Sequence, residues 1–232
     1  MIGEGQTNIW AIVPVKRLGL AKARLAPVLS RSERAEFART MLHDVLTTLC
    51  ATPGLAGIVV VSGDPAVAKL ATLFEARLVG DVMESGVNAA VQQGLRTLDA
   101  SSAGAVVIPA DVPFATAADV QAVIAELQHF PVVLAPALSD GGTNTLAMRR
   151  PDLIVPSFGD DSFARHQALA RDAGLDCGVI RSEGLGHDID DPADLVAWTG
   201  PRKFSLTAAL LAEFKAAHRP GISAFPVSKR RI

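Results

Sequence analysis

Short apolar runs alternate with longer amphipathic segments along most of the chain. The runs at 9–15, 57–62, 105–108 and 130–136 are rich in Val and Ile and contain no regular polar position. Continuous runs of this kind are typical of strands that are buried on both faces, and the segments between them carry apolar residues at helical spacing. Strands that alternate with helices predict an α/β fold with a mostly parallel sheet in three layers.

The same pattern predicts the remaining elements. Ser30 and Glu33 have the spacing of a capping box, which indicates a long helix that ends before Pro53 and Gly54. Further helices are expected at 66–73, 86–98, 116–128, 162–173 and from Pro192 onward, and further strands at 76–79 and 178–181. We expect a single domain over residues 1–200, followed at 201–232 by a C-terminal helix (203–218) and a flexible basic tail.

Composition narrows the class of protein. Hydrophobic residues make up 49% of the 232 residues, which permits a substantial core and argues against global disorder. The formal net charge of −2 gives no support for nucleic acid as a partner. Cys50 and Cys177 form neither a zinc motif nor a disulfide framework, and no apolar run approaches the roughly 20 residues of a membrane span. With no signal-peptide pattern at its start, we expect a cytoplasmic protein without a membrane partner.

One carboxylate follows the central apolar run. Asp111 lies between Pro109 and Pro113, and a proline cannot continue a central strand. Open α/β sheets bind their ligands at the carboxyl ends of their strands. Asp111 is therefore a candidate ligand for Mg²⁺, which prefers oxygen donors, although a cap of a turn or helix is an equally simple role for it.

The loop after the first strand carries only positive charge. It contains four cations and no carboxylate: Lys16, Arg17, Lys22 and Arg24. Such a loop is suited to a triphosphate, although a solvated basic loop would have the same composition. It contains neither the P-loop motif nor the dinucleotide motif.

A second pair of acids occurs late in the chain. Asp188 and Asp190 alternate, so on an extended segment both carboxylates point the same way. Two carboxylates on one side repel each other unless a cation lies between them. This spacing favours a divalent cation.

Polar, glycine-rich turns lie between these segments. The turns at 139–145 and 158–163 carry hydroxyl and amide groups, and the second opens a helix whose amino end suits an anion. A plain hairpin accounts for the first turn equally well. His166, one turn into the helix, either faces the same anion or packs. Gly86 and Asn88 open another helix, where they either read a base or ribose or cap the helix.

Cations for a triphosphate, acids for Mg²⁺ and an anion pocket together predict nucleotidyl transfer. An acceptor phosphate would attack the α-phosphorus of a nucleotide, and pyrophosphate would leave. The protein would align the reactants and neutralise charge. No G-x-S-x-G motif supports a serine nucleophile.

The chain also resembles the 2-phospho-L-lactate guanylyltransferase family, which includes phosphoenolpyruvate and 3-phospho-D-glycerate guanylyltransferases. The resemblance covers residues 9 to 198 in order, at Ile12-Val-Pro-Val-Lys16, Ala21-Lys22-Ala-Arg24-Leu25, Gly86-Val-Asn88-Ala-Ala90, Pro109-Ala-Asp111-Val-Pro113, Asp140-Gly-Gly-Thr143-Asn144, Phe158-Gly159, Ser162-Phe163, Arg165-His166 and Asp188-Ile-Asp190. It implies a GT-A-like, Rossmann-like nucleotidyltransferase fold for residues 1–200. It further implies GTP, Mg²⁺ and a phosphorylated three-carbon acid as acceptor, in the biosynthesis of the deazaflavin coenzyme F-420.

The resemblance also implies residue roles. Lys16, Lys22 and Arg24 would hold the GTP phosphates and act with Asp111 in catalysis, and Asp111, Asp188 and Asp190 would hold the metal. The acceptor's phosphate would lie against Thr143, Gly159 and Ser162, and the base near Ser62, Asp64, Gly86 and Asn88. His187 and the chain after Thr199 depart from the family pattern. A homodimer is compatible with the sequence.

Two other functions stay open. A nucleotidyltransferase of the molybdopterin or sugar type has a related architecture, but those enzymes begin with a Gly-Gly-x-Ser-x-Arg loop, and Val15-Lys16-Arg17-Leu18 stands here instead. A nucleotide-binding regulatory module without turnover is the non-enzymatic alternative. GTP-dependent pyrophosphate release distinguishes the enzyme from the module.

Overall fold

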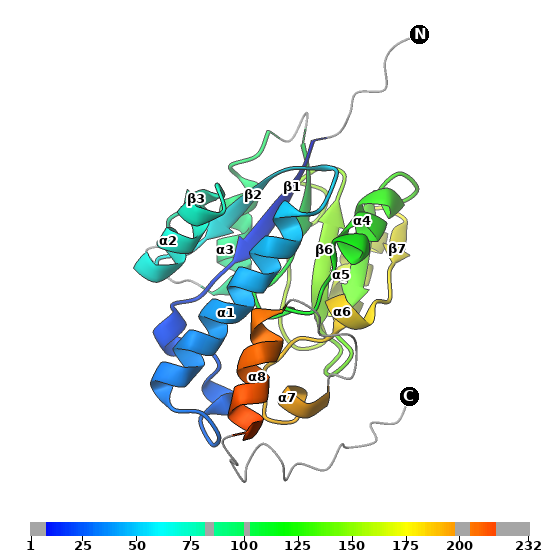
Figure 1. Ribbon diagram of the computed structural model, residues 1–232. Helices are drawn as coiled ribbons and strands as arrows, with labels where there is room; N and C mark the ends of the chain where they lie inside the picture. The colour runs from blue at the N-terminus through cyan, green and yellow to red at the C-terminus, as the bar shows by residue number, and fades with distance from the viewer. Residues whose placement is uncertain (1–7, 82–85, 100–102, 198–204, 217–232) are drawn as a thin grey trace.

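The computed structural model describes residues 8–81, 86–99, 103–197 and 205–216. A seven-stranded sheet crosses the molecule in the order β3-β2-β1-β4-β6-β5-β7 (Figure 1). The strands are β1 (Asn8–Pro14), β2 (Leu55–Val61), β3 (Arg77–Val79), β4 (Ala103–Val107), β5 (Val132–Pro136), β6 (Thr143–Met148) and β7 (Cys177–Val179). β6 runs antiparallel to β4 and β5, and the other pairs are parallel. The predicted mostly parallel α/β sheet is confirmed.

Helices cover both faces of the sheet, which gives the three layers expected from the sequence. The helices are α1 (Arg31–Cys50), α2 (Pro65–Leu73), α3 (Val87–Leu95), α4 (Ala117–Glu126), α5 (Ser162–Asp172), α6 (Glu183–Gly186), α7 (Asp194–Ala197) and α8 (Leu206–Ala216), with 3₁₀ turns η1 (Leu18–Leu20) and η2 (Ala23–Leu25) in the cationic loop. Side chains of α1, α2, α4, α6, α7 and α8 pack into the core on one face. Those of α3 and α5 form the core on the other.

Local sequence explains where helices α1 and α4 begin. The Ser30 hydroxyl accepts a hydrogen bond from the backbone N–H of Glu33, whose carboxylate accepts one from Ser30 in return, so the predicted capping box is confirmed. Thr116 and Asp119 form a second capping box at the start of α4. Helices α3 and α4 end a few residues before the predicted limits of 98 and 128, in turns.

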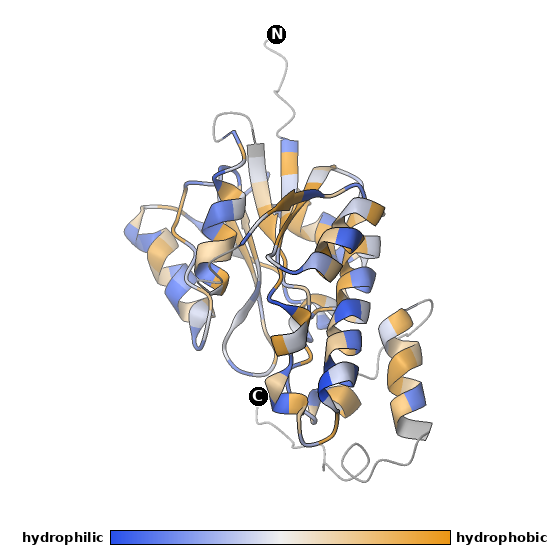
Figure 2. Cartoon of the chain, turned by 90° about the vertical axis from the view of Figure 1, so that its left-hand side faces the viewer, coloured by the Kyte–Doolittle hydropathy of each residue, from blue (hydrophilic) through white to orange (hydrophobic). Residues whose placement is uncertain are grey.

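The predicted C-terminal helix is present as α8, and it packs directly on α1. The Asp44 carboxylate accepts hydrogen bonds from the Ser205 hydroxyl and from the backbone N–H groups of Leu206 and Thr207. The rings of Phe37 and Phe214 lie 6.1 Å apart. Much of α8 is apolar (Figure 2). Its side chains Ala208, Leu211 and Phe214 belong to the same core cluster as those of α1. The predicted basic tail at 219–232 lies outside the described residues.

The state of the cysteines and the character of the helices can be compared with the predictions from composition. Cys50 and Cys177 both carry free thiols. No helix among the described residues has the length and apolar character that crossing a bilayer requires.

The antiparallel direction of β6 brings its first residue to the edge of the sheet where the parallel strands end. The carboxyl ends of β1, β2 and β4 lie at this edge because these strands are parallel. β6 is antiparallel to β4, so its first residue, Thr143, lies at the same edge. The predicted site segments therefore converge on one side of the molecule.

Candidate active site

A cavity of about 640 Å³ opens at this edge of the sheet. Its walls come from the loop after β1, the start of α3 and the loop after β4, with Ala38 and Met41 of α1 behind them. All four predicted cations line it: Lys16, Arg17, Lys22 and Arg24. Asp111 and Asp190 line it as well. The cationic loop and two of the three predicted acids thus share one cavity of a size that suits a small-molecule ligand.

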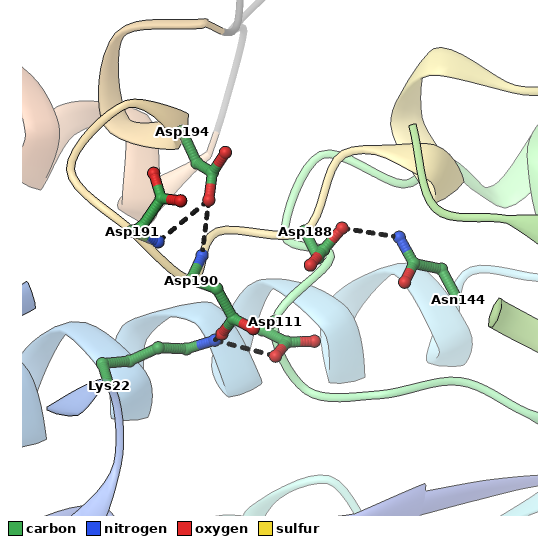
Figure 3. A network of polar contacts seen from close by, with 7 residues as sticks. All are labelled: Lys22, Asp111, Asn144, Asp188, Asp190, Asp191 and Asp194. Carbon is green, nitrogen blue, oxygen red and sulfur yellow. Dashed lines mark hydrogen bonds and ion pairs between the residues drawn. The ribbon is translucent and has the colours of Figure 1, made fainter. Parts of the chain in front are cut away.

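Lys22 lies between these two acids (Figure 3). Its Nζ is 2.7 Å from Oδ2 of Asp111 and 2.7 Å from Oδ1 of Asp190. Burial lowers the pKa of Lys22, but attraction to the two carboxylates outweighs it and leaves the pKa above its ordinary value. The ammonium is therefore charged, and its side chain is only 8% exposed. The backbone at Lys22 has φ 53°, an uncommon conformation for a residue other than glycine.

Asp190 is ionised because positive charges surround it. Burial raises the pKa of its carboxyl, but Lys22, Arg24 and Lys16 outweigh burial and hold the pKa below its ordinary value. Three of the predicted phosphate-binding cations thus act on one carboxylate.

Asp194 fixes the turn that presents Asp190. Its Oδ2 accepts hydrogen bonds from the backbone N–H groups of Asp190 and Asp191, at 3.0 and 2.9 Å (Figure 3). His187 lies on the other side of the turn, with its ring 5.9 Å from that of Phe114 and its Nε2 3.2 Å from the carbonyl oxygen of Asp194. Asp194 was not among the residues predicted from the sequence. An acid in the first turn after Pro192 was the only signal for it.

Asp188 has a different partner from Asp190. Its Oδ1 accepts a 3.0 Å hydrogen bond from Nδ2 of Asn144 (Figure 3). The side chain of Asp188 is buried. Burial raises the pKa of Asp188 to about 6, the bond from Asn144 opposes the rise, and the charges of Asp111 and Asp190 add to it. The three acids are therefore neighbours, but Asp188 does not share the Lys22 contact.

The predicted metal set is not assembled as a three-acid cluster. Within the ranges that the structure describes, no three or more His, Cys, Asp and Glu side chains are grouped so that they could hold a metal ion. The physical reason is that Lys22 lies between Asp111 and Asp190, while Asp188 pairs with Asn144. A metal at these acids stays a prediction.

The predicted acceptor residues meet at the start of β6 and of α5. The backbone N–H of Thr143 donates a 2.8 Å hydrogen bond to the Ser162 hydroxyl, and both side chains are buried. Gly159 has φ 122°, which a side chain would make strained, and it precedes the first turn of α5. The structure brings Thr143 and Ser162 into contact and places Gly159 in the adjoining loop.

A register shift in the sheet separates Thr143 from Asn144. Ala135 pairs with Thr145 and Pro136 with Thr143, so Asn144 is an extra residue opposite β5. Such a bulge re-aims side chains at the end of a strand. Thr143 contacts His166 of α5, whereas Asn144 contacts Asp188. Neighbouring residues thereby serve both parts of the site.

The predicted base-binding residues mostly hold the scaffold. Asp64 caps α2 through Ala66 and also accepts a 2.8 Å hydrogen bond from the N–H of Leu18 in the cationic loop. Ser62 is buried and accepts from the N–H of Asp64. Asn88 makes two hydrogen bonds with the backbone of Phe158. Gly86, with φ 92°, lines the cavity. Base contact at these residues stays a prediction.

Comparison with known proteins identifies close relatives. The chain is 39% identical over 197 residues to the phosphoenolpyruvate guanylyltransferase of Sphaerobacter thermophilus, covering 82% of this chain and 92% of the relative. It is 37% identical over 205 residues to the 3-phospho-D-glycerate guanylyltransferase of Phenylobacterium zucineum, covering 86% and 93%. It is 35% identical over 185 residues to the 2-phospho-L-lactate guanylyltransferase of Methanothermobacter thermautotrophicus, covering 80% and 81%.

Solved structures share the fold at low sequence identity. The structure of CMP:2-keto-3-deoxy-manno-octonic acid synthetase complexed with CTP has a TM-score of 0.58 and 14% identity, over 89% of this chain and 99% of that chain. A 4-diphosphocytidyl-2C-methyl-D-erythritol synthase from Anaerococcus prevotii has a TM-score of 0.58 and 13% identity, over 90% and 97%. These likenesses show the fold alone.

The family comparison covers most of the described chain. The family model described as guanylyl transferase, CofC like, matches residues 9–199, and the match ends before α8. The matched range includes the cationic loop and the three acids Asp111, Asp188 and Asp190. The chain therefore belongs to the CofC-like guanylyl transferase family.

Proposed function

We propose that this protein transfers GMP from GTP to the phosphate of a three-carbon phospho-acid and releases pyrophosphate. The observation that carries the proposal is the cavity lined by four cations and by the Lys22-paired carboxylates Asp111 and Asp190. The names of the relatives supply the acceptor class: 2-phospho-L-lactate, 3-phospho-D-glycerate or phosphoenolpyruvate. The place of this reaction is the biosynthesis of the deazaflavin coenzyme F-420.

The reaction needs charge neutralisation rather than a protein nucleophile. A phosphate oxygen of the acceptor forms a bond to the α-phosphorus of GTP, while the bond from that phosphorus to the bridging oxygen breaks and pyrophosphate takes the electron pair. Both reactants are anions, so they repel until cations lie beside them. Lys16, Lys22 and Arg24 supply these charges from one loop, and preorganised charges of this kind stabilise the transition state.

Mg²⁺ is the cofactor that we propose. Asp111 and Asp190 are the residues that would hold it, because their oxygens already converge on one positive charge, that of Lys22. Mg²⁺ sites in nucleotide enzymes commonly use one or two carboxylates together with substrate phosphates, so a pair fits this ion. Once bound, the ion would neutralise phosphate charge. Asp188 adds a carboxylate from the neighbouring position, and Asn144 orients it.

The acceptor's phosphate belongs, in this proposal, against Thr143, Gly159 and Ser162. The buried hydroxyls of Thr143 and Ser162 lie at the amino end of α5, an eleven-residue helix whose positive end favours an anion. Gly86 would approach the nucleotide through its backbone at the cavity wall. Ser62, Asp64 and Asn88 would support that wall through their bonds to the loops.

Pyrophosphate release tests the proposal. The purified chain is mixed with GTP and Mg²⁺, and with 2-phospholactate, phosphoenolpyruvate or 3-phosphoglycerate in parallel. Release with one acceptor, lost in Asp111→Asn and retained in the matched surface variant Asp152→Asn, is the expected result. If folded protein that binds GTP releases no pyrophosphate with any of the three acceptors, the acceptor class is refuted and a non-catalytic nucleotide-binding module is favoured.

A further inference from the structure

His166 lies at the centre of a buried polar cluster beside the proposed acceptor site. Its side chain is fully buried. Its Nε2 is 2.9 Å from the backbone nitrogen of Ser157, and its Nδ1 is 2.9 Å from Oγ1 of Thr143. Its ring meets the ring of Phe158 edge to face, with centroids 5.0 Å apart. One side chain thus joins the loop before α5 to the first residue of β6.

The backbone contact fixes the position of the proton on the imidazole. The N–H of Ser157 can only donate, so Nε2 of His166 accepts and carries no proton. A neutral imidazole then carries its proton on Nδ1, which donates to Oγ1 of Thr143. Burial and the charge of Arg165 lower the pKa of His166 to about 4, so the neutral form is the one present near pH 7.

This tautomer sets the direction of the Thr143 hydroxyl. Because Oγ1 accepts from His166, the hydroxyl proton is left to point elsewhere. The Ser162 hydroxyl is in the same situation, since its oxygen accepts from the N–H of Thr143. Both hydroxyls are consequently arranged as donors, and a phosphate offers only acceptors at these positions.

The same histidine also supports the loop that carries Gly159. Ser157 and Phe158 precede Gly159, and His166 contacts both of them. Asn88 of α3 holds Phe158 from the other side through two hydrogen bonds. The loop, Thr143 and Ser162 are therefore fixed relative to one another by the buried His166 and the half-buried Asn88.

We propose that His166 is a positioning residue for the acceptor: its Nδ1–H orients the Thr143 hydroxyl to donate to the acceptor's phosphate, and its Nε2 holds the Ser157–Gly159 loop. The inference rests on the proposed function and extends it to a residue that does not itself touch substrate. It predicts an effect on the acceptor and not on GTP, since the cavity lining includes none of these residues.

Two substitutions separate the two ends of the imidazole. His166→Asn places an amide donor near the position of Nδ1, so it keeps the bond to Thr143 and loses the one to Ser157. His166→Gln places an amide oxygen near the position of Nε2, so it keeps the bond to Ser157 and loses the one to Thr143. Each variant loses one neutral hydrogen bond, so their Tm values provide a matched measure of stability.

Steady-state kinetics on the full chain gives the test. We expect His166→Gln to raise KM for the acceptor by about tenfold, with KM for GTP unchanged, and His166→Asn to raise it by less than about threefold. Thr143→Val should match His166→Gln, and the double variant should be no worse than either single one. Thr143→Ser should behave as wild type.

The results distinguish a failure of the proposed function from a failure of the inference about His166. If wild type releases no pyrophosphate with any acceptor, the proposed function and this inference both fall. If wild type is active, the inference alone is overturned by additive effects in the double variant, by equal effects of Asn and Gln, or by a rise in KM for GTP as large as that for the acceptor. If His166→Gln does not fold, Thr143→Val decides, and an unchanged acceptor KM in that variant overturns the inference.

Discussion

Lys22 and Asp111 are 89 positions apart in the sequence, yet Nζ of Lys22 lies 2.7 Å from Oδ2 of Asp111. Asp190, from a third segment, accepts from the same ammonium. Carboxylates that converge on a lysine are also the ligands that a divalent cation prefers. The lysine and a metal ion would therefore compete for the same oxygens.

Replacing Lys22 with Met should expose this competition. The ammonium is removed and two carboxylates are left facing each other, so we expect the free energy of unfolding at pH 7 to fall by roughly 1–3 kcal/mol. That is less than for a fully buried pair, because Asp190 is 43% exposed. Urea denaturation measures the loss. Millimolar Mg²⁺ should stabilise the variant more than wild type.

The control for Lys22 is Arg150→Met, which breaks the exposed pair with Asp152. It should change stability little, and Mg²⁺ should stabilise it only as much as it stabilises wild type. An equal response of Lys22→Met and wild type to Mg²⁺ would contradict the competition.

Asp194→Asn tests the turn that presents Asp190. The substitution weakens the two charged hydrogen bonds to the backbone N–H groups of Asp190 and Asp191, and the Asp190 carboxylate loses its fixed position. Residues that orient ligands typically affect activity by about 10–100-fold, so we expect kcat/KM to fall by about tenfold, and further in Asp190→Asn. Pyrophosphate release measures both. Full activity of folded Asp194→Asn would show that the turn does not need this carboxylate.

Stability should fall as the medium is acidified because of His166. The folded protein lowers the pKa of His166 from 6.5 to about 4, so between these values the unfolded chain binds a proton that the folded chain does not. The contribution of the neutral His166 to the free energy of unfolding is fully present above pH 6.5, falls as pH drops, and is lost at about pH 4. Its upper limit is about 3 kcal/mol.

The contribution of Asp188 to stability depends on pH in the opposite direction, so the two contributions must be measured separately. Its raised pKa of about 6 gives a contribution that is present below pH 3.8 and lost as pH rises through about 6. Wild type and His166→Asn share this contribution. The difference between their free energies of unfolding, measured in urea from pH 4 to 7.5, should therefore shrink as pH falls. A difference that is constant over this range would contradict a neutral, buried His166.

Removing the Asp44 carboxylate should loosen α8. Asp44→Ala leaves the hydroxyl of Ser205 and two backbone N–H groups at the start of the helix without their acceptor. We expect a loss of about 1–3 kcal/mol in the free energy of unfolding, and a smaller loss in Asp44→Asn, which retains an oxygen acceptor. Thermal and urea denaturation check this. Equal stability of wild type and Asp44→Ala would show that the cap contributes nothing.

The sequence predicted the sheet and most of its helices because each depends on local pattern. Buried runs of Val and Ile mark β1, β2, β4 and β5, and a capping box marks the start of α1. The cationic loop and Asp111 were also predicted, because charged residues that directly follow a buried parallel strand lie at the edge of the sheet where ligands bind. The lengths of α3 and α4 were overestimated at ends where no cap residue gave a clear signal.

The partners of the charged residues could not be predicted. Alternation placed Asp188 and Asp190 on one side of an extended segment, but the segment turns at Asp190 through Asp194, and each acid takes a different partner. Asn88 and Asp64 are predicted to lie near the nucleotide base, and their hydrogen bonds include contacts with the backbone of Phe158 and Leu18, 70 and 46 positions away, which the sequence pattern does not indicate. Such pairings depend on tertiary contacts, which a single sequence does not encode in its periodicity.

The extra residue in β6 has an evolutionary consequence. Deleting Asn144 would give β5 and β6 a regular ladder, which is the simpler and easier hairpin to form, but it would remove the partner of Asp188 and shift Thr143 away from His166. Selection for folding alone would favour losing this residue, whereas selection for the site would keep it. The irregular ladder therefore gives up regular pairing with β5 but keeps the side-chain directions of Thr143 and Asn144. Insertions and deletions should be tolerated far better in the 137–142 turn than at 143–145.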